Sequence, residues 1–442
     1  MVPGSDLRHR HRPTIKPTST ITFGKDSRHM LRKRSLKRLT VPFLLITILL
    51  LGLVAATAAT ADRFYASRIV AWREADFHDF ERFPSRRVPA GSKAFSFEPA
   101  AQNPPEYLRT ITYHQDAPEP ATPRESMATA LDAVGGTEIT EPLEEFLTDT
   151  DTSAFLVIRD DALLYEDYFN GYDRASTQTS FSVAKSFVSA LVGIAIREGH
   201  IGSVDDPVTE YIPELEGQGM DRVTIRHLLT MSSGLEYSGE GDGGGPLGDD
   251  AKTYYDPNLR ELALTVKPEV EPGTRWEYNN YHPLLLGMIL ERATERPVAT
   301  YLSQKIWRPL GMEADGSWSL DSEASGFEKM ESGINARAID FAKFGRLYLN
   351  RGEWNGEQVV PASWVEKSTQ VDTKTDPADF YQYFWWVDVV EPERGRFMAR
   401  GNLGQYIYVV PDKDLVIVRM GESFGYNRWP ELLRSIADKA PP

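Results

Sequence analysis

Ser182 and Lys185 form an S-x-x-K motif at the start of a predicted apolar helix. The helix is expected because Ser180, a residue type that caps helices, precedes the motif and a run without charged residues follows it over 187–196. Residues three apart lie on one face of a helix, so the Lys185 amine can reach the Ser182 hydroxyl. A serine needs a base to act as a nucleophile near neutral pH, and an uncharged lysine can be that base. The spacing therefore predicts a serine nucleophile, unless Ser182 only caps the helix and Lys185 lies in solvent.

A second pattern, Tyr278-x-Asn280, lies on a predicted loop in the helical middle of the chain. A tyrosine hydroxyl can carry protons between a nucleophile and a leaving group. An asparagine amide can hold a substrate carbonyl and keep the lysine in place. Taken alone, the same residues are also compatible with a polar turn that carries a packed aromatic ring.

The two motifs, in this order and about 96 residues apart, resemble those of the serine β-lactamase and penicillin-binding-protein superfamily in its class C-like form. Further phrases are similar to the same family, and the match covers roughly residues 140–440. They are TIRHLLTMSSGL at 224–235, EPGT at 271–274 and LLLG at 284–287. The resemblance implies a hydrolase that works through an acyl-enzyme on Ser182, with Lys185 as base. It also implies that Tyr278 relays protons and that Asn280 positions the lysine and the substrate.

The third motif of that family, K-T-G on the strand that lines the site, is absent. Arg400-Gly401-Asn402 stands at the equivalent place and keeps the glycine. The backbone amide of Asn402 is then the second oxyanion donor, beside that of Ser182. In family members that handle β-lactams, the missing lysine binds the substrate carboxylate, so esters and amides are expected as substrates over β-lactams. Arg400 either replaces the missing positive charge or points into solvent.

Two phrases near the third motif are similar to the branch that contains 6-aminohexanoate-dimer hydrolase and related esterases and amidases. They are FWW at 384–386 and GQYIYVVP at 404–411. The resemblance implies an enzyme that cleaves small esters or amides, including short linear amides, without a cofactor or a metal. Two alternatives stay open: a D-Ala-D-Ala peptidase or β-lactamase, and a membrane-anchored sensor or binding module without turnover.

Other residues that suggest chemistry are interpreted as structural. Gly421–Gly425 matches G-x-S-x-G, but no histidine follows Ser423, so the Ser-acid-His order of an α/β-hydrolase cannot be completed. His282 follows the Tyr278 loop and is expected to be a hydrogen-bonded structural residue, with entry into the cleft as the alternative. The eight histidines show no metal-binding spacing, and the absence of cysteine excludes a thiol nucleophile and disulfides.

The distribution of charge indicates a membrane protein with an acidic body. Residues 1–40 carry a net charge of +9 and the whole chain carries −15, so the other 402 residues carry −24. A body this acidic argues against nucleic-acid binding. The run 41–61 has no charged residue, and its 21 residues can span a bilayer with the basic flank in the cytoplasm and the body outside. The alternative is secretion after cleavage of a signal peptide near Ala61.

The chain divides by composition into four parts. These are a basic disordered cytoplasmic tail at 1–40, a transmembrane anchor or signal at 41–61, a connector at 62–118 and the catalytic domain at 119–442. Hairpins are predicted near 154–165 and 406–418. They predict one antiparallel sheet built from both ends of the domain and flanked by helices, with a mainly helical insertion at about 200–330. The fold class is therefore α/β (α+β) and, by the resemblance, β-lactamase-like; the oligomeric state stays open.

Overall fold

The computed structural model describes residues 63–99, 104–239, 245–370, 372 and 376–441 of the chain. The predicted tail and the predicted membrane-spanning run lie outside the described residues. Within the described part, no helix has the length and apolar character that a bilayer crossing needs. The predicted anchor therefore stays a prediction.

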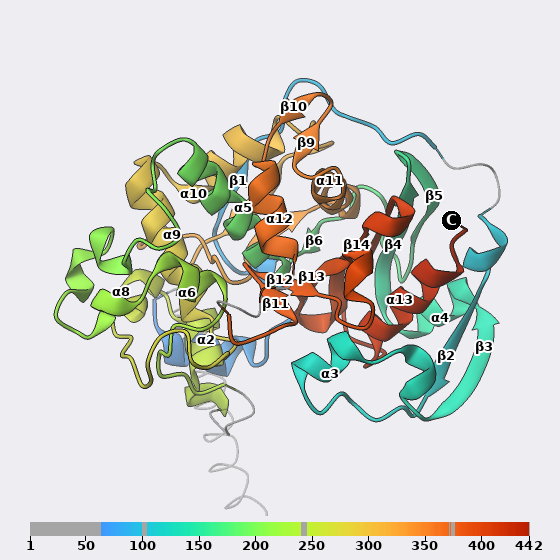
Figure 1. Ribbon diagram of the computed structural model, residues 1–442, viewed down its shortest axis with the longest axis horizontal. Coiled ribbons are helices and arrows are strands. Elements are labelled where there is room, and N and C mark those ends of the chain that lie inside the picture. Colours follow the sequence, from blue (N-terminus) through green and yellow to red (C-terminus); the bar gives the residue numbers. More distant parts are fainter. Residues whose placement is uncertain (1–62, 100–103, 240–244, 371, 373–375, 442) are drawn as a thin grey trace, which may run out of the picture. The chain divides into compact units, whose positions relative to one another are not determined.

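The centre of the fold is a seven-stranded antiparallel sheet with the strand order β11-β12-β13-β14-β15-β4-β5 (Figure 1). β15 pairs with β4, which joins the two ends of the domain in one sheet and confirms the predicted arrangement. The two predicted hairpins are β4–β5 and β14–β15. The strands are β4 (Thr152–Arg159), β5 (Ala162–Tyr168), β11 (Tyr381–Gln382), β12 (Trp385–Val387), β13 (Phe397–Gly401), β14 (Gln405–Val410) and β15 (Leu415–Gly421).

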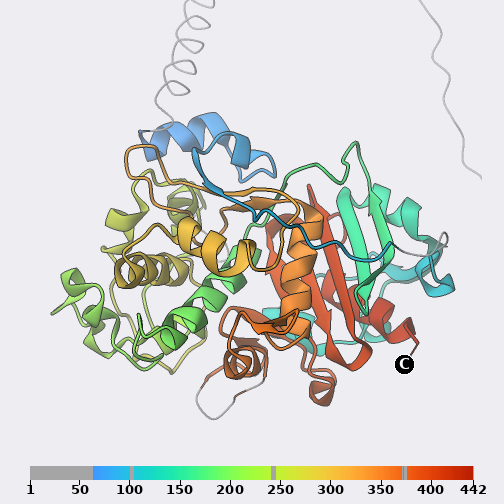
Figure 2. The same cartoon turned by 90° about the horizontal axis from the view of Figure 1, so that it is seen from above.

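Helices cover both faces of this sheet, which explains why β4, β14 and β15 consist largely of buried apolar residues. α11 packs against β14 and β15 on one face, and α4 packs against β4 on the other, where α13 also lies (Figure 2). α5 packs against β13 and β14, and α12 packs against α5 and β12. The helices are α4 (Leu143–Asp149), α5 (Val183–Arg197), α11 (Ala338–Leu349), α12 (Ala362–Thr369) and α13 (Trp429–Lys439).

The predicted insertion is mainly helical in its described residues. Its helices are α6 (Ile225–Leu229), α7 (Asp249–Tyr255), α8 (Leu259–Ala263), α9 (Tyr281–Thr294) and α10 (Val298–Leu302). A four-stranded sheet of order β1-β7-β8-β6 connects it with the chain before the S-x-x-K motif. In that sheet β6 (Gln178–Thr179), directly before the motif, pairs with β8 (Ile334–Ala336).

The segment expected as a connector, 62–118, contributes folded elements where it is described. They are α2 (Tyr65–Trp72), which packs against α7, β1 (Ser85–Val88), which pairs with β7 (Gly316–Ser319), and β2 (Thr110–Gln115), which pairs with β3 (Thr137–Pro142). Its buried residues Phe77 and Phe83 stand among charged residues without a regular period, so the sequence pattern did not reveal these elements. The folded body thus begins before the predicted boundary at residue 119.

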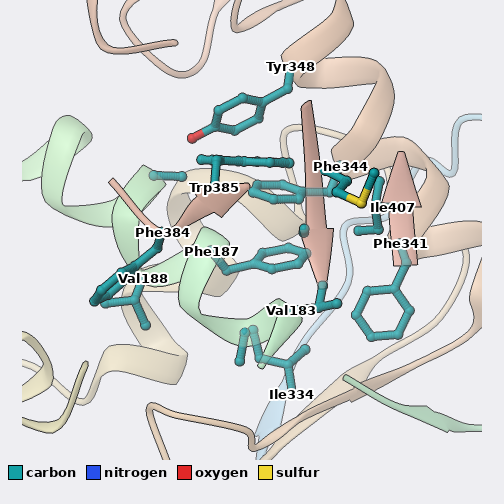
Figure 3. Close-up of a cluster of buried hydrophobic side chains, with 14 of the residues drawn as sticks. Val183, Phe187, Val188, Ile334, Phe341, Phe344, Tyr348, Phe384, Trp385 and Ile407 are labelled. Carbon is teal, nitrogen blue, oxygen red and sulfur yellow. The ribbon is translucent and has the colours of Figure 1, made fainter. Parts of the chain in front are cut away.

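An apolar cluster between α5, α11 and the sheet holds the helix that carries the S-x-x-K motif (Figure 3). Phe187 of α5 stacks on Phe344 of α11, with ring centroids 3.6 Å apart and an interplanar angle of 14°. Phe344 also stacks on Trp385 of β12. The three side chains are fully buried. Truncating a buried aromatic side chain costs about 3–5 kcal/mol, so this cluster fixes the position of α5 firmly.

His282, in the first turn of α9, is buried and bonded within the fold, and it does not line the cavity described below. Its Nε2 lies 2.5 Å from the Ser233 hydroxyl oxygen, and its Nδ1 lies 3.0 Å from the Met231 sulfur. Burial, which disfavours the charged imidazolium, is the main cause that lowers the pKa of His282 to about 3. This placement agrees with the structural interpretation.

The lowered pKa of His282 predicts a stability that decreases in acid. Between pH 6.5 and about pH 3 the unfolded chain binds one proton at this residue that the folded protein does not bind. The free energy of unfolding should therefore fall by about 1.4 kcal/mol per pH unit in this window, with the full contribution present above it. In urea unfolding, the decrease in the free energy of unfolding from pH 7 to pH 5 should be smaller for His282→Gln than for the wild type. Equal losses in the two proteins would contradict the assignment.

Candidate active site

Ser182 is the residue directly before α5, and Lys185 lies in the first turn of that helix. The Lys185 Nζ donates a hydrogen bond of 2.8 Å to the Ser182 Oγ. It donates another, of 2.9 Å, to the backbone carbonyl oxygen of Glu331. Lys185 is only 1% exposed, so these two contacts replace water around its amine. The helix thus brings the hydroxyl and the amine together at the spacing that the motif predicts.

The residue before the serine has an unusual backbone conformation. Phe181 has φ 41°, in the left-handed region, which costs a residue other than glycine about 1–3 kcal/mol. Ser180 holds the turn in place, because its N–H donates to the Ile334 carbonyl at 2.8 Å and its hydroxyl donates to the Ser332 carbonyl at 3.1 Å. The turn presents Ser182 at the amino end of α5, where the unpaired amides of a helix favour negative charge.

A cavity of about 780 Å³ opens beside the serine. Its walls include six of the residues singled out from the sequence: Ser182, Tyr278, Asn280, Arg400, Gly401 and Asn402. Lys185 lies behind this wall, bonded to the serine. Residues from α5, from the loop before α9 and from the end of β13 therefore meet around one space.

The ring of Tyr278 is fixed by aromatic neighbours next to the lysine. The Lys185 Nζ lies 4.9 Å from the centroid of this ring. Trp386 stacks on the ring at 5.9 Å, and Tyr381 meets it edge-on at 6.2 Å. Within the described part of the chain the Tyr278 hydroxyl forms no hydrogen bond, so it is available to a substrate.

Asn280 is held by partners other than the lysine. Its Nδ2 donates to the Tyr237 hydroxyl oxygen at 3.1 Å and to the Asp250 Oδ1 at 3.2 Å. Its Oδ1 is buried and has no hydrogen-bond partner among the described residues. The direct contact with Lys185 that the resemblance implied is therefore not formed here.

The end of β13 brings the third-motif residues to the same space. A Cβ on Gly401 would stand 2.4 Å from the Ser180 carbonyl oxygen, so only glycine allows this close approach to the turn before Ser182. Asn402 follows directly and lines the cavity. The Arg400 guanidinium lies 4.6 Å from the ring centroid of Trp386, also at the cavity. Its Nη1 also lies 3.4 Å from the Ser126 Oγ, and the replacement of the missing lysine by Arg400 stays a prediction.

Sequence reasoning missed a buried ion pair next to the backbone carbonyl that holds Lys185. The Lys329 Nζ lies 2.8 Å from the Glu331 Oε1, which also accepts a 2.8 Å hydrogen bond from the Ser332 hydroxyl. Burial lowers the pKa of Lys329, and the negative charge of Glu331 opposes this shift. Since the carbonyl of Glu331 accepts the hydrogen bond from Lys185, the pair fixes the backbone that holds the lysine. No motif marks these residues in the sequence.

Sequence reasoning also missed a wall of the cavity that comes from the expected connector. Ile69, Arg73, Glu74 and Ala75 line the cavity. α2 is held by the buried Arg68, whose guanidinium lies 5.2 Å from the ring centroid of Phe83 and donates to the Tyr255 carbonyl at 3.2 Å. The family resemblance begins only near residue 140, so no familiar phrase pointed to this wall.

The second candidate nucleophile has a structural place. The Ser423 hydroxyl donates to the Asp151 Oδ2 at 2.7 Å in a loop after β15, and Ser423 does not line the cavity. Its contact with a carboxylate rather than a histidine agrees with the interpretation of this motif as a strand-end turn. In the part of the chain that the structure covers, no group of histidine and carboxylate side chains has the arrangement that a metal ion needs.

Similarity to known proteins extends over the motifs that line the cavity. The family described as Beta-lactamase matches residues 143–440. The 6-aminohexanoate-dimer hydrolase of Paenarthrobacter ureafaciens is 30% identical over 338 residues, which cover 71% of this chain and 81% of that protein. Esterase EstB of Burkholderia gladioli is 35% identical over 154 residues, which cover 32% of this chain and 38% of that protein.

The fold of a solved structure is similar as well. A candidate 6-aminohexanoate-dimer hydrolase from Bacillus anthracis superposes with a TM-score of 0.68 at 26% identity, and the match covers 83% of this chain and 92% of that one. The family match spans about two thirds of the chain and contains all the motif residues described above. The protein is therefore a serine hydrolase that belongs to the β-lactamase family.

Proposed function

We propose that the protein hydrolyses small esters and amides through an acyl-enzyme formed on Ser182. The observation that carries this proposal is the 2.8 Å hydrogen bond between the Lys185 Nζ and the Ser182 Oγ at the wall of the cavity. A serine hydroxyl alone is a weak nucleophile, and a base in direct contact with it removes that limit.

In the proposed acylation, the Ser182 Oγ attacks the substrate carbonyl carbon while the uncharged Lys185 amine takes the hydroxyl proton. The carbonyl oxygen becomes an oxyanion, which the backbone amides of Ser182 and Asn402 stabilise. The Tyr278 hydroxyl gives its proton to the leaving alcohol or amine and regains one from the protonated lysine. The bond to the leaving group breaks, and the acyl group stays on the serine.

In the proposed deacylation, a water molecule attacks the acyl-enzyme from the cavity. Tyr278 passes its hydroxyl proton to the uncharged Lys185 and takes a proton from this water, and the protonated Lys185 returns its proton to the Ser182 Oγ as the acid leaves. Asn280 lines the cavity, and its side-chain amide is assigned to contact with the substrate. The aromatic contacts of Tyr278 support its proposed role in proton transfer, because they fix the ring while leaving its hydroxyl available.

The proposed substrates are small esters and short linear amides. The names of two relatives, a 6-aminohexanoate-dimer hydrolase and an esterase, support this class. The position of Arg400 at the cavity favours substrates that carry a carboxylate. The same observation supports a second candidate function, the cleavage of D-Ala-D-Ala peptides or β-lactams, because these substrates also carry a carboxylate. A binding module without turnover is disfavoured because nucleophile and base are in contact.

Loss of the nucleophile should abolish turnover. Ser182→Ala should lower the rate of p-nitrophenyl butyrate hydrolysis about 10³-fold or more, because removal of a catalytic serine typically costs orders of magnitude. Ser423→Ala makes the same change outside the cavity and should keep the wild-type rate. Release of p-nitrophenol measures all three proteins. Equal rates for Ser182→Ala and the wild type would contradict the proposal and favour the binding module.

The ion pair of Lys329 and Glu331 should act on the rate through the placement of Lys185. Glu331→Gln keeps the carbonyl that holds the lysine amine but leaves Lys329 buried without its partner charge, which costs about 3–5 kcal/mol of stability. A small displacement of the base should then lower kcat about 10²-fold, with a smaller change in KM.

The double variant Lys329→Met/Glu331→Gln removes both charges and serves as the control. It should regain thermal stability and part of kcat, because no buried charge is then left alone. Thermal unfolding and steady-state kinetics on a p-nitrophenyl ester give both quantities. An unchanged kcat in Glu331→Gln would show that the pair does not position the base.

Arg400 should discriminate between charged and neutral substrates. Arg400→Gln should lower kcat/KM about 10-fold or more for an amide or ester with a free carboxylate, because a charge-assisted hydrogen bond contributes about 1.5–3 kcal/mol. Hydrolysis of a neutral short-chain ester should change little, and Arg400→Lys should restore part of the loss. The comparison requires matched substrates with and without the carboxylate. An equal loss on both would assign Arg400 a structural role.

A further inference from the structure

The exposed apolar side chains of the described surface gather at the catalytic cavity. Four large hydrophobic residues of the described part are exposed, and we call them the apolar rim: Phe64 (58%), Val70 (55%), Leu247 (76%) and Phe424 (44%). Single exposed apolar residues are ordinary on soluble proteins. A group of them around one site instead marks a surface that contacts something apolar.

Two segments far apart in the sequence bring part of the apolar rim together. The Tyr65 hydroxyl donates to the Pro246 carbonyl, which links the residue after Phe64 to the residue before Leu247. Pro246 itself lines the cavity. Leu247, the most exposed member of the rim, directly follows this lining residue, although it is remote from α2 in the chain.

The other members of the apolar rim also adjoin the cavity. Val70 lies in α2 directly after Ile69, which lines the cavity, and Phe424 lines the cavity itself. Figure 2 shows the blue N-terminal segment that contains α2 lying along one edge of the folded body. One member of the rim, Phe424, therefore lines the cavity, and two others, Val70 and Leu247, directly follow residues that line it.

The charges on this edge suit a lipid surface. Arg63 and Arg73 flank α2 and are exposed, with Glu74 exposed beside Arg73, although residues 41–442 carry a net charge of −24. Arginine side chains next to exposed apolar side chains are the combination found on segments that lie in a bilayer interface, where the cations meet phosphate groups and the apolar residues meet acyl chains.

The position of the apolar run 41–61 in the chain also points to a lipid surface. The apolar run 41–61 ends two residues before Arg63, so α2 is the first described element after the predicted membrane span. The eight residue-to-residue steps from Ala61 to Ile69 can extend over at most about 29 Å. If the run spans a bilayer as predicted, the cavity wall that contains Ile69 cannot lie farther than this from the end of the span.

We propose that the apolar rim contacts the surface of a phospholipid bilayer, so that the catalytic cavity receives amphiphilic esters or amides directly from the membrane. The substrate class would be molecules whose carbonyl group lies at the interface and whose acyl chain lies in the bilayer. The choice of substrate rests on the proposed function, but contact of the rim with lipid does not require turnover.

A fluorescence experiment on the full-length protein tests the contact. The chain has no cysteine, so Leu247→Cys can be labelled alone with an environment-sensitive fluorophore. Glu357→Cys is the matched control, because Glu357 is exposed on β10 (Glu357–Gln358), on the other side of the body from α2 in Figure 1. In phosphatidylcholine–phosphatidylglycerol vesicles that contain nitroxide-labelled lipid, the label at 247 should lose most of its emission and the label at 357 should not.

Quenching of the label at 247 also distinguishes lipid from protein as the partner of the apolar rim. If nitroxide lipid does not quench it, the proposal is overturned. Shielding of the same label from iodide without quenching by lipid would show that a protein, such as a second copy of this chain, covers the apolar rim instead. The label at 247 should be quenched to the same extent with and without the additional substitution Ser182→Ala, because contact with lipid does not need the nucleophile.

A hydrolysis experiment tests the substrate class separately. In vesicles, Val70→Ser/Leu247→Ser should hydrolyse a long-chain fluorogenic ester about 10-fold more slowly than the wild type, because two apolar side chains no longer enter the interface. A water-soluble short-chain ester should be hydrolysed at the same rate by both. Equal rates on the long-chain ester would overturn delivery from the membrane. If the wild type hydrolyses neither ester while the label at 247 is quenched, the proposed function fails and the lipid contact stands.

Discussion

The hydrogen bond from Lys185 to Ser182 is the interaction on which the site depends. A lysine amine in water carries a proton near neutral pH and moves freely, so a catalytic lysine has to be both shielded from water and fixed in place. The first turn of α5 provides the spacing, and the carbonyl of Glu331 provides the second contact. Since Lys185 is almost fully buried, these contacts substitute for hydration.

Both parts of the fold contribute to holding that contact. The stacked rings of Phe187, Phe344 and Trp385 connect α5 with α11 and the sheet, so the helix cannot shift without breaking the core. The strained Phe181 directs Ser182 into the cavity, and the absence of a side chain at Gly401 lets β13 approach the same turn. Strain and close approach are tolerated here because the surrounding packing enforces them.

Features that depend on local spacing could be predicted from the sequence. The two hairpins follow from apolar runs broken by turn residues, and the contact between Ser182 and Lys185 follows from helical geometry. The partners of Asn280, the ion pair of Glu331 and the fold of α2 could not be predicted, because each depends on residues brought together over long stretches of chain. The predicted membrane span lies outside the described residues and stays a proposal.

The most direct measurement of the central claim is the site of covalent modification by a fluorophosphonate probe, which reacts with activated serines. The full-length protein is treated with the probe, residual ester hydrolysis is followed, and the modified peptide is identified by mass spectrometry. The account predicts one adduct, on Ser182, whose amount parallels the loss of activity. An adduct on Ser423, or hydrolysis that persists after Ser182 is fully modified, would contradict it.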